Sequence, residues 1–248
     1  MKDFIAIDFE TANPKRVSAC AIGYARVSNG DIVESKGYLI KPVGGHAPFQ
    51  SKIHGIKEEH TCSQPEFCAL YPIIAGIFDS PLVAHSLFDE QVLRALARYF
   101  GIAINFIYHD TSSMAKMRLP DLKNHKLKTL VKYFKLPTFK HHDAKEDAIA
   151  CARVYLKLQD LDQDNPVQIA GDSKTEFKGL ISDILEDDVV DYKEAYQLLY
   201  WLEDHRDIAK EYEELTETTR RFLQDDVLDN IEAKALRMML LYIRDKIF

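Results

Sequence analysis

The sequence predicts an α/β protein followed by an all-helical segment, and three observations support this. Apolar runs with the period of β-strands fill the first 40 residues. Strand and helix patterns then alternate from about residue 65 to residue 160, as is typical of α/β domains. After a polar stretch the pattern becomes wholly helical. A chain of 248 residues is long enough for one large domain or two ordinary ones.

Composition narrows the class of protein. Hydrophobic residues make up 46% of the chain and charged residues 29%, as in soluble globular proteins. No apolar run approaches the roughly 20 residues that a membrane helix needs, and the start of the chain lacks a signal-peptide pattern. We expect a cytoplasmic protein with reduced, mostly buried thiols, because the cysteines form neither a CxxC pair nor a regular framework. These cysteines are Cys20, Cys62, Cys68 and Cys151.

The stretch Phe4–Thr11 organises the rest of the chain. Its apolar, β-branched residues predict a buried strand, yet Asp8 and Glu10 lie near its end. Residues two apart in a strand point to the same face, so both carboxylates would aim at one place. Two such anions repel each other unless a cation holds them, and oxygen ligands suit Mg²⁺ or Mn²⁺. Solvated acids at an exposed strand end are the alternative interpretation.

The following residues predict a meander of strands. A second strand is expected over Val17–Val27 and a third over Ile32–Ile40. Asn29-Gly30 between them is the strongest short signal for a hairpin. A helical region and a short buried strand should follow, over Pro65–Phe78 and Pro81–His85.

A helix is then predicted to open at Ser86, where Ser-x-x-Asp is typical of a helix cap. Gly101 should end it. Asp89 would lie in the first turn, where the helix dipole favours a carboxylate. Stabilisation of the helix start explains Asp89 by itself and is also compatible with a role as a metal ligand. The apolar residues of this helix repeat every four positions, at Phe88, Val92, Leu96 and Phe100.

A later helix start combines histidines with acids. Asp143 and Glu146 predict a capping box, so the helix should begin near Ala144. His142 then lies just before the helix, and Asp147 lies about one turn into it. A histidine and a carboxylate that meet at a helix start can act together in catalysis, although a single histidine is more often structural or solvated.

Three motifs of the chain are Asp8-Phe9-Glu10-Thr11, Ala84-His85-Ser86-Leu87-Phe88-Asp89 and His142-Asp143-Ala144-Lys145-Glu146-Asp147. In this order they resemble the three motifs of the DEDDh exonucleases. The chain is similar to their DnaQ-like branch, typified by the proofreading ε subunit of bacterial DNA polymerase III. Ile53-His54-Gly55-Ile56 and the lysine-rich approach to the third motif also resemble that branch. The resemblance covers about residues 3–160.

The resemblance implies a ribonuclease H-like fold, a mixed sheet of about five strands with helices on both faces. It also implies two divalent metal ions, Mg²⁺ or Mn²⁺, and hydrolysis of the last phosphodiester at a 3′ end to release a nucleoside monophosphate. His142 would be the general base, because the His-x-Ala-x-x-Asp spacing selects it over His141. The metal ligands would be Asp8, Glu10, Asp89 and Asp147.

The resemblance further implies a pocket for the terminal nucleotide. Phe9 and the backbone of Thr11 would contact that nucleotide, and Ser18 and His54 are further candidates for lining the pocket. His85 would support the site without performing the chemistry. Lys145-Glu146 departs from the family pattern but leaves every metal ligand in place.

Charge is distributed unevenly along the chain. Residues 1–165 carry a net charge of +2 and residues 166–248 a net charge of −9. Between Lys116 and Lys140 there are eight basic residues against one acid, Asp121. A polyanionic partner and a solvated helix face both account for this basic patch.

We expect an exonuclease domain over residues 1–162, a polar linker over 163–175 and an acidic helical domain over 176–248. The helical part contains an internal repeat, since Ile184–Asp191 resembles Phe222–Asp229 at an offset of 38 residues. Each copy continues into a predicted capping box and an apolar helix. The boxes pair Asp191 with Glu194 and Asp229 with Glu232. This domain should bind a protein partner or self-associate, because it lacks catalytic groupings and its charge repels DNA phosphates.

The favoured function is therefore a metal-dependent 3′–5′ exonuclease acting on DNA in replication or repair. An exoribonuclease that trims RNA 3′ ends would use the same chemistry, and the sequence does not reveal how a pocket treats the 2′-hydroxyl. A module that holds 3′ ends or a polymerase without cutting is a third hypothesis. The complete set of four acids and a histidine argues against it.

Overall fold

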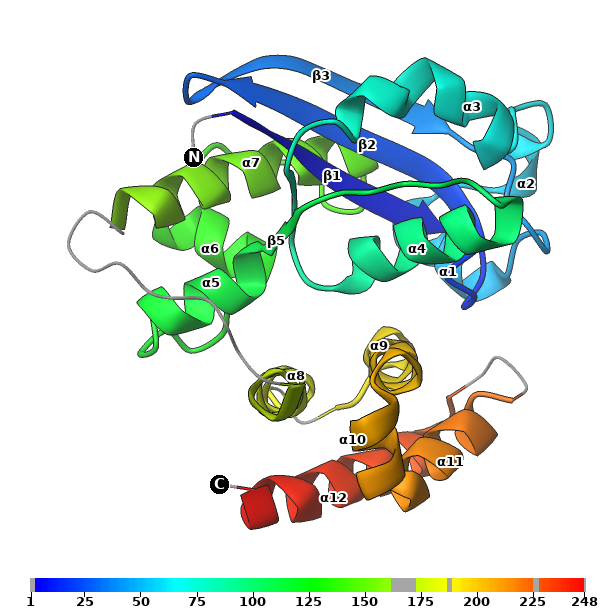
Figure 1. Cartoon of the computed structure of the whole chain (residues 1–248), viewed down its shortest axis with the longest axis vertical. Coiled ribbons are helices and arrows are strands. Elements are labelled where there is room, and N and C mark those ends of the chain that lie inside the picture. Colours follow the sequence, from blue (N-terminus) through cyan, green and yellow to red (C-terminus); the bar gives the residue numbers. More distant parts are fainter. Residues whose placement is uncertain (1–2, 162–172, 187–188, 225–227, 248) are drawn as a thin grey trace. The chain divides into compact units, whose positions relative to one another are not determined.

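The structure is a computed structural model that describes residues 3–161, 173–186, 189–224 and 228–247. It divides into two compact units, Met1–Val167 and Gln168–Phe248. Figure 1 shows the helices and strands of each unit. The division falls within the expected linker, of which residues 163–172 lie outside the described residues, while residues 173–175 belong to a helix.

A mixed sheet of five strands forms the centre of the first unit, in the order β3-β2-β1-β4-β5. β1 is antiparallel to β2 and β2 to β3, whereas β4 is parallel to β1 and β5 to β4. The strands are β1 Phe4–Thr11, β2 Ala19–Ser28, β3 Asp31–Leu39, β4 Leu82–Ala84 and β5 Tyr108–Asp110. The expected mixed sheet is confirmed.

The predicted hairpin joins β2 to β3. Asn29 and Gly30 have φ angles of 53° and 88°, and Ser28 pairs with Asp31 across the turn. Two successive residues with positive φ form the type I′ turn that matches the twist of the flanking strands.

Helices cover both faces of the sheet (Figure 1). Ile5, Ile7 and Phe9 of β1 belong to a core that includes residues of α3 (Phe67–Ile74) and α4 (Phe88–Phe100). Phe4 and Ala6 belong to a second core, with residues of α5 (Thr111–Arg118), α6 (Leu127–Tyr133) and α7 (Ala144–Asp160). Since side chains alternate along a strand, Asp8 and Glu10 continue the row of Phe4 and Ala6 and face α7.

The helices of the first unit lie between and after these strands. They are α1 Pro48–His54, α2 Glu58–Thr61, α3 Phe67–Ile74, the 3₁₀ turn η1 Ala75–Ile77, α4 Phe88–Phe100, α5 Thr111–Arg118, α6 Leu127–Tyr133 and α7 Ala144–Asp160. The apolar face predicted for α4 is confirmed, because Val92 and Leu96 are buried and Phe88 and Phe100 pack against the same core.

The second unit is helical over its described residues, as expected. Its helices are α8 Ser173–Ile184, α9 Tyr192–Asp204, α10 Arg206–Glu211, α11 Glu213–Phe222 and α12 Asn230–Ile247. The two copies of the repeat begin at the last residues of α8 and α11, and each leads to a new helix. Phe177 and Trp201 stack in the core of this unit, with ring centroids 5.3 Å apart.

Both predicted capping boxes of the second unit are present. The N–H of Asp191 donates to Glu194 Oε2 (2.9 Å), and the N–H of Glu194 donates to Asp191 Oδ1 (2.8 Å). Asp229 and Glu232 make the same two bonds, at 3.0 and 2.8 Å. Capping therefore accounts for Asp191, Glu194, Asp229 and Glu232 without a ligand.

Two expectations from composition can be compared with the structure. All four cysteines are free, but Cys62 and Cys68 are exposed, so the expectation of mostly buried thiols is wrong for half of them. Among the described residues, no helix combines the length and the apolar character needed to cross a membrane.

Candidate active site

Three carboxylates from two elements lie together near the end of β1. Asp8 and Glu10 come from β1 and Asp147 from the first turn of α7, and one oxygen of each lies within 4.8 Å of the others. The side chains of Glu10 and Asp147 are only 6% and 4% exposed. Three anions held together, two of them buried, are unfavourable unless a cation compensates them. The cluster is therefore suited to a divalent cation.

Gly23 allows α7 to approach this cluster. It is the residue opposite Asp8 in the ladder between β1 and β2. A Cβ atom at this position would lie 2.1 Å from the carbonyl carbon and oxygen of Ala144 and 2.3 Å from the backbone nitrogen of Lys145. Glycine is the residue that permits so close an approach of two backbones. The start of α7 can thus lie directly against β2, within reach of Asp8.

Asp89 extends the hydrogen bonding of β1 beyond the end of β4. Of the residues of β1, only Ile5 and Ala6 pair with β4, and the N–H of Ile5 donates to Pro81 O (2.9 Å). Four residues further, the N–H of Phe9 donates to Asp89 Oδ1 (2.7 Å). Asp89 is buried beside the carboxyl ends of two parallel strands, where open α/β sheets bind ligands. It is not one of the three acids of the compact cluster.

The start of α4 differs from the prediction. Asp89 does lie in the first turn, but the N-cap residue is Leu87, whose side chain makes no capping bond. Ser86 has a φ of 103°, and its Oγ accepts a bond from the N–H of Phe88 (3.3 Å). The prediction of Ser86 as the cap is wrong because Asp110 Oδ1 accepts the N–H of Ser86 (2.8 Å) and holds it in the preceding loop.

Two stacked histidines lie against the carboxylates, with ring centroids 4.0 Å apart. Nδ1 of His142 is 3.7 Å from Glu10 Oε1. Nδ1 of His141 is 2.8 Å from Asp147 Oδ1, and since an ionised carboxylate only accepts, this nitrogen carries the proton. His142 is one-third exposed, with a φ of 64°. Histidine is one of the residues that adopts this left-handed conformation more often than most.

Both carboxylate oxygens of Asp147 accept hydrogen bonds. His141 binds Oδ1, and the N–H of Asp143 donates to Oδ2 (3.1 Å). Asp143 caps α7 by accepting from the N–H of Glu146 (3.4 Å), so the predicted helix start is confirmed. The reciprocal half of the predicted box is replaced by the bond to Asp147. Neither contact with Asp147 could be predicted from a periodic pattern in the sequence.

A hydrogen-bonded network supports β4 and the start of α4. Thr111 Oγ1 donates to Ala84 O (3.1 Å) and lies 2.8 Å from His85 Nδ1. Asp110 Oδ1 accepts the N–H groups of Ser86 and Ser112, both at 2.8 Å. Burial lowers the pKa of His85 to about 4. A neutral His85 bonded to Thr111 fits the expected supporting role, and sequence patterns gave no signal for Thr111 or Asp110.

The charges of the acids contribute to the raised pKa values of two buried groups near them. Burial is the main cause that raises the pKa of the Cys151 thiol well above its usual value, and the charges of Asp89, Asp8 and Asp110 raise it further. The pKa of Tyr108 is also well above its usual value, because of burial first and then of Asp89 and Asp110. The contributions of the acids to these two pKa shifts are those of a negative potential, which attracts cations.

Two residues predicted to touch a nucleotide have buried side chains. Phe9 is 2% exposed and lies in the core on the face opposite Asp8. Ser18 is fully buried, and its Oγ binds the carbonyls of Asn13 (2.8 Å) and Lys15 (2.6 Å). In this structure neither side chain is exposed, and contact of either residue with the terminal nucleotide stays a prediction. Phe9 anchors Asp89 through its N–H, and Ser18 shapes the turn after β1.

Thr11 and His54 meet at the end of β1. His54 Nδ1 accepts the N–H of Ile56 (3.0 Å), so its Nε2 carries the proton and donates to the Thr11 carbonyl (3.2 Å). This bond fixes α1 beside the end of the acidic strand. The structure thus places His54 against the Thr11 backbone, where the sequence predicted a nucleotide contact.

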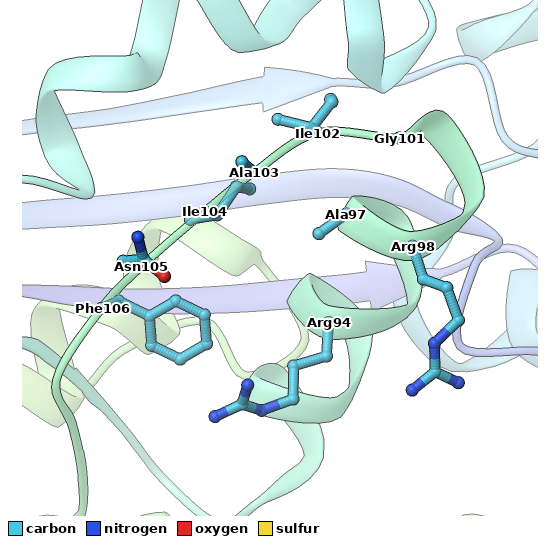
Figure 2. Close-up of a pocket in the computed structure, with 9 residues that line it drawn as sticks. All are labelled: Arg94, Ala97, Arg98, Gly101, Ile102, Ala103, Ile104, Asn105 and Phe106. Carbon is cyan, nitrogen blue, oxygen red and sulfur yellow. The ribbon is translucent and has the colours of Figure 1, made fainter.

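A separate cavity of about 470 Å³ lies between α4 and the segment that precedes β5 (Figure 2). The guanidinium of Arg94 lies 4.9 Å from the centroid of the Phe106 ring and also binds Glu90. None of the predicted site residues lines this cavity. The candidate site is therefore the cluster of acids near the carboxyl end of the central strand β1.

The comparisons with known proteins agree with this geometry. Residues 5–155 match the family model RNase_T, described as exonuclease. The chain is 25% identical over 226 residues to a protein named DNA polymerase III PolC-type from Caldanaerobacter subterraneus subsp. tengcongensis. That match covers 89% of this chain, and so extends into the helical unit, but only 16% of the relative.

Solved structures share the fold. Exonuclease X in complex with 5′-overhanging duplex DNA has a TM-score of 0.51 and 21% identity, with 64% of this chain and 93% of that chain covered. The nuclease domain of 3′hExo bound to rAMP, a DEDDh family member, has a TM-score of 0.57 and 13% identity, with 66% and 93% covered. With the acidic cluster in place, the chain belongs to the RNase T exonuclease family and resembles its DEDDh members in fold and motifs.

Proposed function

We propose that the first unit is a metal-dependent 3′–5′ exonuclease that hydrolyses the terminal phosphodiester of DNA and releases nucleoside monophosphates. The observation that carries this proposal is the meeting of Asp8, Glu10 and Asp147 within 4.8 Å, with His142 at 3.7 Å from Glu10. Replication or repair of DNA is the process we assign to it. This assignment is supported by the match to PolC-type polymerases, of which the chain spans only a small part.

The donor set fits divalent metal ions. Asp8, Glu10 and Asp147 offer only oxygen ligands, as Mg²⁺ and Mn²⁺ prefer, and Asp89 contacts the same strand by accepting the N–H of Phe9 (2.7 Å). We assign these four acids as ligands of two ions. When bound, such ions stabilise the attacking and leaving oxygens of an in-line displacement and lower the pKa of water towards neutrality. Removal of either acid of β1 should therefore abolish cleavage.

We assign His142 as the general base that takes the proton from the attacking water. An imidazole has a reference pKa near 6.5 and accepts a proton readily at cellular pH. The position of His142, one-third exposed beside Glu10, leaves it accessible to a water molecule. His141 has a different role, because its hydrogen bond to Asp147 Oδ1 keeps that carboxylate oriented towards β1.

DNA and RNA remain the two candidate substrates. The names of the PolC-type relatives favour DNA. The rAMP in the complex of 3′hExo favours the second candidate, an exoribonuclease that trims RNA 3′ ends. A module that binds a 3′ end or a polymerase without cutting is the least supported function, because it does not require a compact cluster of acids.

The deciding experiment uses a 5′-labelled single-stranded DNA oligonucleotide and its RNA counterpart, each with Mg²⁺ or Mn²⁺. We expect a ladder of products that shorten from the 3′ end, faster on DNA, and no ladder with a chelator or with Asp8→Ala. Asp8→Ala should keep the fold, because loss of one anion relieves repulsion in the metal-free protein. Intact DNA and RNA under all conditions would refute the proposed activity, and a faster ladder on RNA would select the second candidate.

A further inference from the structure

Helix α6 is amphipathic, with an outer face made of lysines. Leu127, Leu130 and Val131 are buried in the core that α6 shares with α7. Lys128 and Lys132 lie on the opposite side, one turn apart, and both are exposed. Lys135 and Lys140 follow the helix and are exposed as well. We call Lys128, Lys132, Lys135 and Lys140 the lysine face.

Most of the lysine face has no acid to neutralise it. Among the described residues, no carboxylate lies within salt-bridge distance of Lys128, Lys132 or Lys135, and only Lys140 approaches one, at 3.7 Å from Asp143. Like charges at positions i and i+4 of a helix destabilise it. Some other exposed lysines of this unit are paired, for example Lys36 with Glu34 (2.7 Å) and Lys157 with Asp160 (3.6 Å). The positive charge on α6 is therefore uncompensated within the described protein.

The lysine face is close in sequence to the histidines of the candidate active site. Lys140 directly precedes His141, and six peptide units join Lys135 to His141, so these residues are at most about 20 Å apart. α6 and α5 also pack against α7, the helix that carries Asp147 (Figure 1). Within α6, Lys128 and Lys132 are about 6 Å apart along the axis at 1.5 Å per residue, which is longer than the axial spacing of about 3.4 Å between successive phosphates of one strand.

We propose that the lysine face binds the backbone phosphates of single-stranded DNA on the 5′ side of the nucleotide being removed. The choice of this strand rests on the proposed 3′–5′ exonuclease. Lysine ammonium groups recognise phosphates without regard to base sequence, so the face adds affinity for long strands and no sequence preference. It also explains why uncompensated charges are placed on a helix next to the third motif.

Binding can be measured without cleavage, in the full-length chain with Asp8→Ala as background. The test variant adds Lys128→Gln and Lys132→Gln, and the matched control adds Lys36→Gln and Lys157→Gln, which remove the same charge. Fluorescence anisotropy would give the dissociation constant of a long labelled single-stranded DNA at several salt concentrations. Each contact with a single-strand phosphate contributes about 0.7 to the slope of log affinity against log salt.

We expect the slope to become shallower by about 1.4 in the test variant and to stay unchanged in the control. Between 50 and 200 mM salt, the affinity of the parent protein should fall about 7-fold more than that of the test variant. Equal slopes and affinities in the test variant and the control would overturn the proposal, and the lysine face would then be open to an acidic protein or to solvent.

The same substitutions in the otherwise native chain separate this proposal from the proposed function. With active enzyme, the advantage in KM of a long strand over a trinucleotide should shrink in the test variant alone. If the native chain cleaves DNA but the test variant matches the control, the lysine face is rejected and the exonuclease stands. If the native chain cleaves nothing but the salt slope still changes, the lysine face stands and the exonuclease is rejected.

Discussion

His142 combines an uncommon backbone conformation with a position beside Glu10 of the acidic cluster. Its φ of 64° lies in the left-handed region, and its ring stacks on His141 while Nδ1 faces Glu10. Residues held in such conformations gather at functional sites, where the surrounding structure maintains them. The turn before α7 thus presents this imidazole to the carboxylates.

Replacement of His142 by Asn tests its chemical role with little effect on the fold, because Asn tolerates the left-handed conformation. We expect turnover at saturating Mg²⁺ to fall on the order of 10²–10⁴-fold, as for loss of a general base. Steady-state kinetics would measure turnover, and thermal melting would check the fold. His142→Ala is the control for conformation: both variants should lose the same activity, although Ala is less stable at this φ. Normal turnover combined with weaker metal binding would show that the role is wrong.

For single residues, the sequence predicted the positions of the acids better than the contacts of the residues around them. The two-residue period places Asp8 and Glu10 on one face, and the same period places Phe9 on the other, so the burial of Phe9 follows from the argument that located the acids. The family pattern alone suggested its contact with substrate. The bond between His141 and Asp147 depends on the path of the turn at residues 141–143, which no periodicity encodes.

The approach of α7 to β2 is the decisive contact between elements. It depends on Gly23, because backbone atoms of Ala144 and Lys145 occupy the space that any Cβ atom would need. The sheet supplies Asp8 and Glu10, and α7 supplies Asp147. The distance between these two elements therefore sets the size of the cluster.

Substitution of Gly23 by Ala should push the start of α7 away from β2. Overpacking of this kind costs about 1–3 kcal/mol of stability, and Asp147 would leave the cluster. We expect a lower melting temperature together with loss of exonuclease activity. Gly76→Ala is the matched control, because nothing lies within 4 Å of a Cβ at that position. Native activity in Gly23→Ala would contradict the assigned role of the close approach.

Long elements were predictable, and so was the short strand β4, whose residues are all apolar, but other short elements were not. β1, the hairpin at Asn29-Gly30 and the start of α7 follow from apolar periodicity, turn chemistry and capping. β5 has three residues and α6 seven, too few for periodicity to separate strand from helix. The acids that depend on long elements were found, whereas the support from Asp110 and Thr111, next to β5, was missed.

For the whole molecule, the two compact units lead to a prediction about truncation. A chain that ends at Val167 keeps both cores of the first unit and every assigned site residue. We expect it to melt cooperatively and to shorten DNA from the 3′ end at a rate close to that of the full chain. Circular dichroism and the labelled-oligonucleotide assay would measure this. Loss of folding in the fragment would show that the helical unit is part of the catalytic domain.

The full chain and the chain that ends at Val167 also test the role proposed for residues 168–248. That role is docking to a protein or self-association. Light scattering would report the mass of each, and recovery of partners from a lysate would be compared between them. Unchanged mass and unchanged recovery after truncation would remove the basis for this role. The repeat and its two capping boxes explain how this unit folds but name no partner.

Lys128 and Lys132 repel each other in the free protein, since they lie one turn apart without an acid between them. Dissolved salt screens that repulsion and so stabilises α6 before any nucleic acid is bound. Once DNA is bound, the same ions compete for the lysines and loosen the complex. Ionic strength therefore acts with opposite sign on folding and on binding, and the salt concentration that best preserves the protein is not the one at which it holds its substrate best.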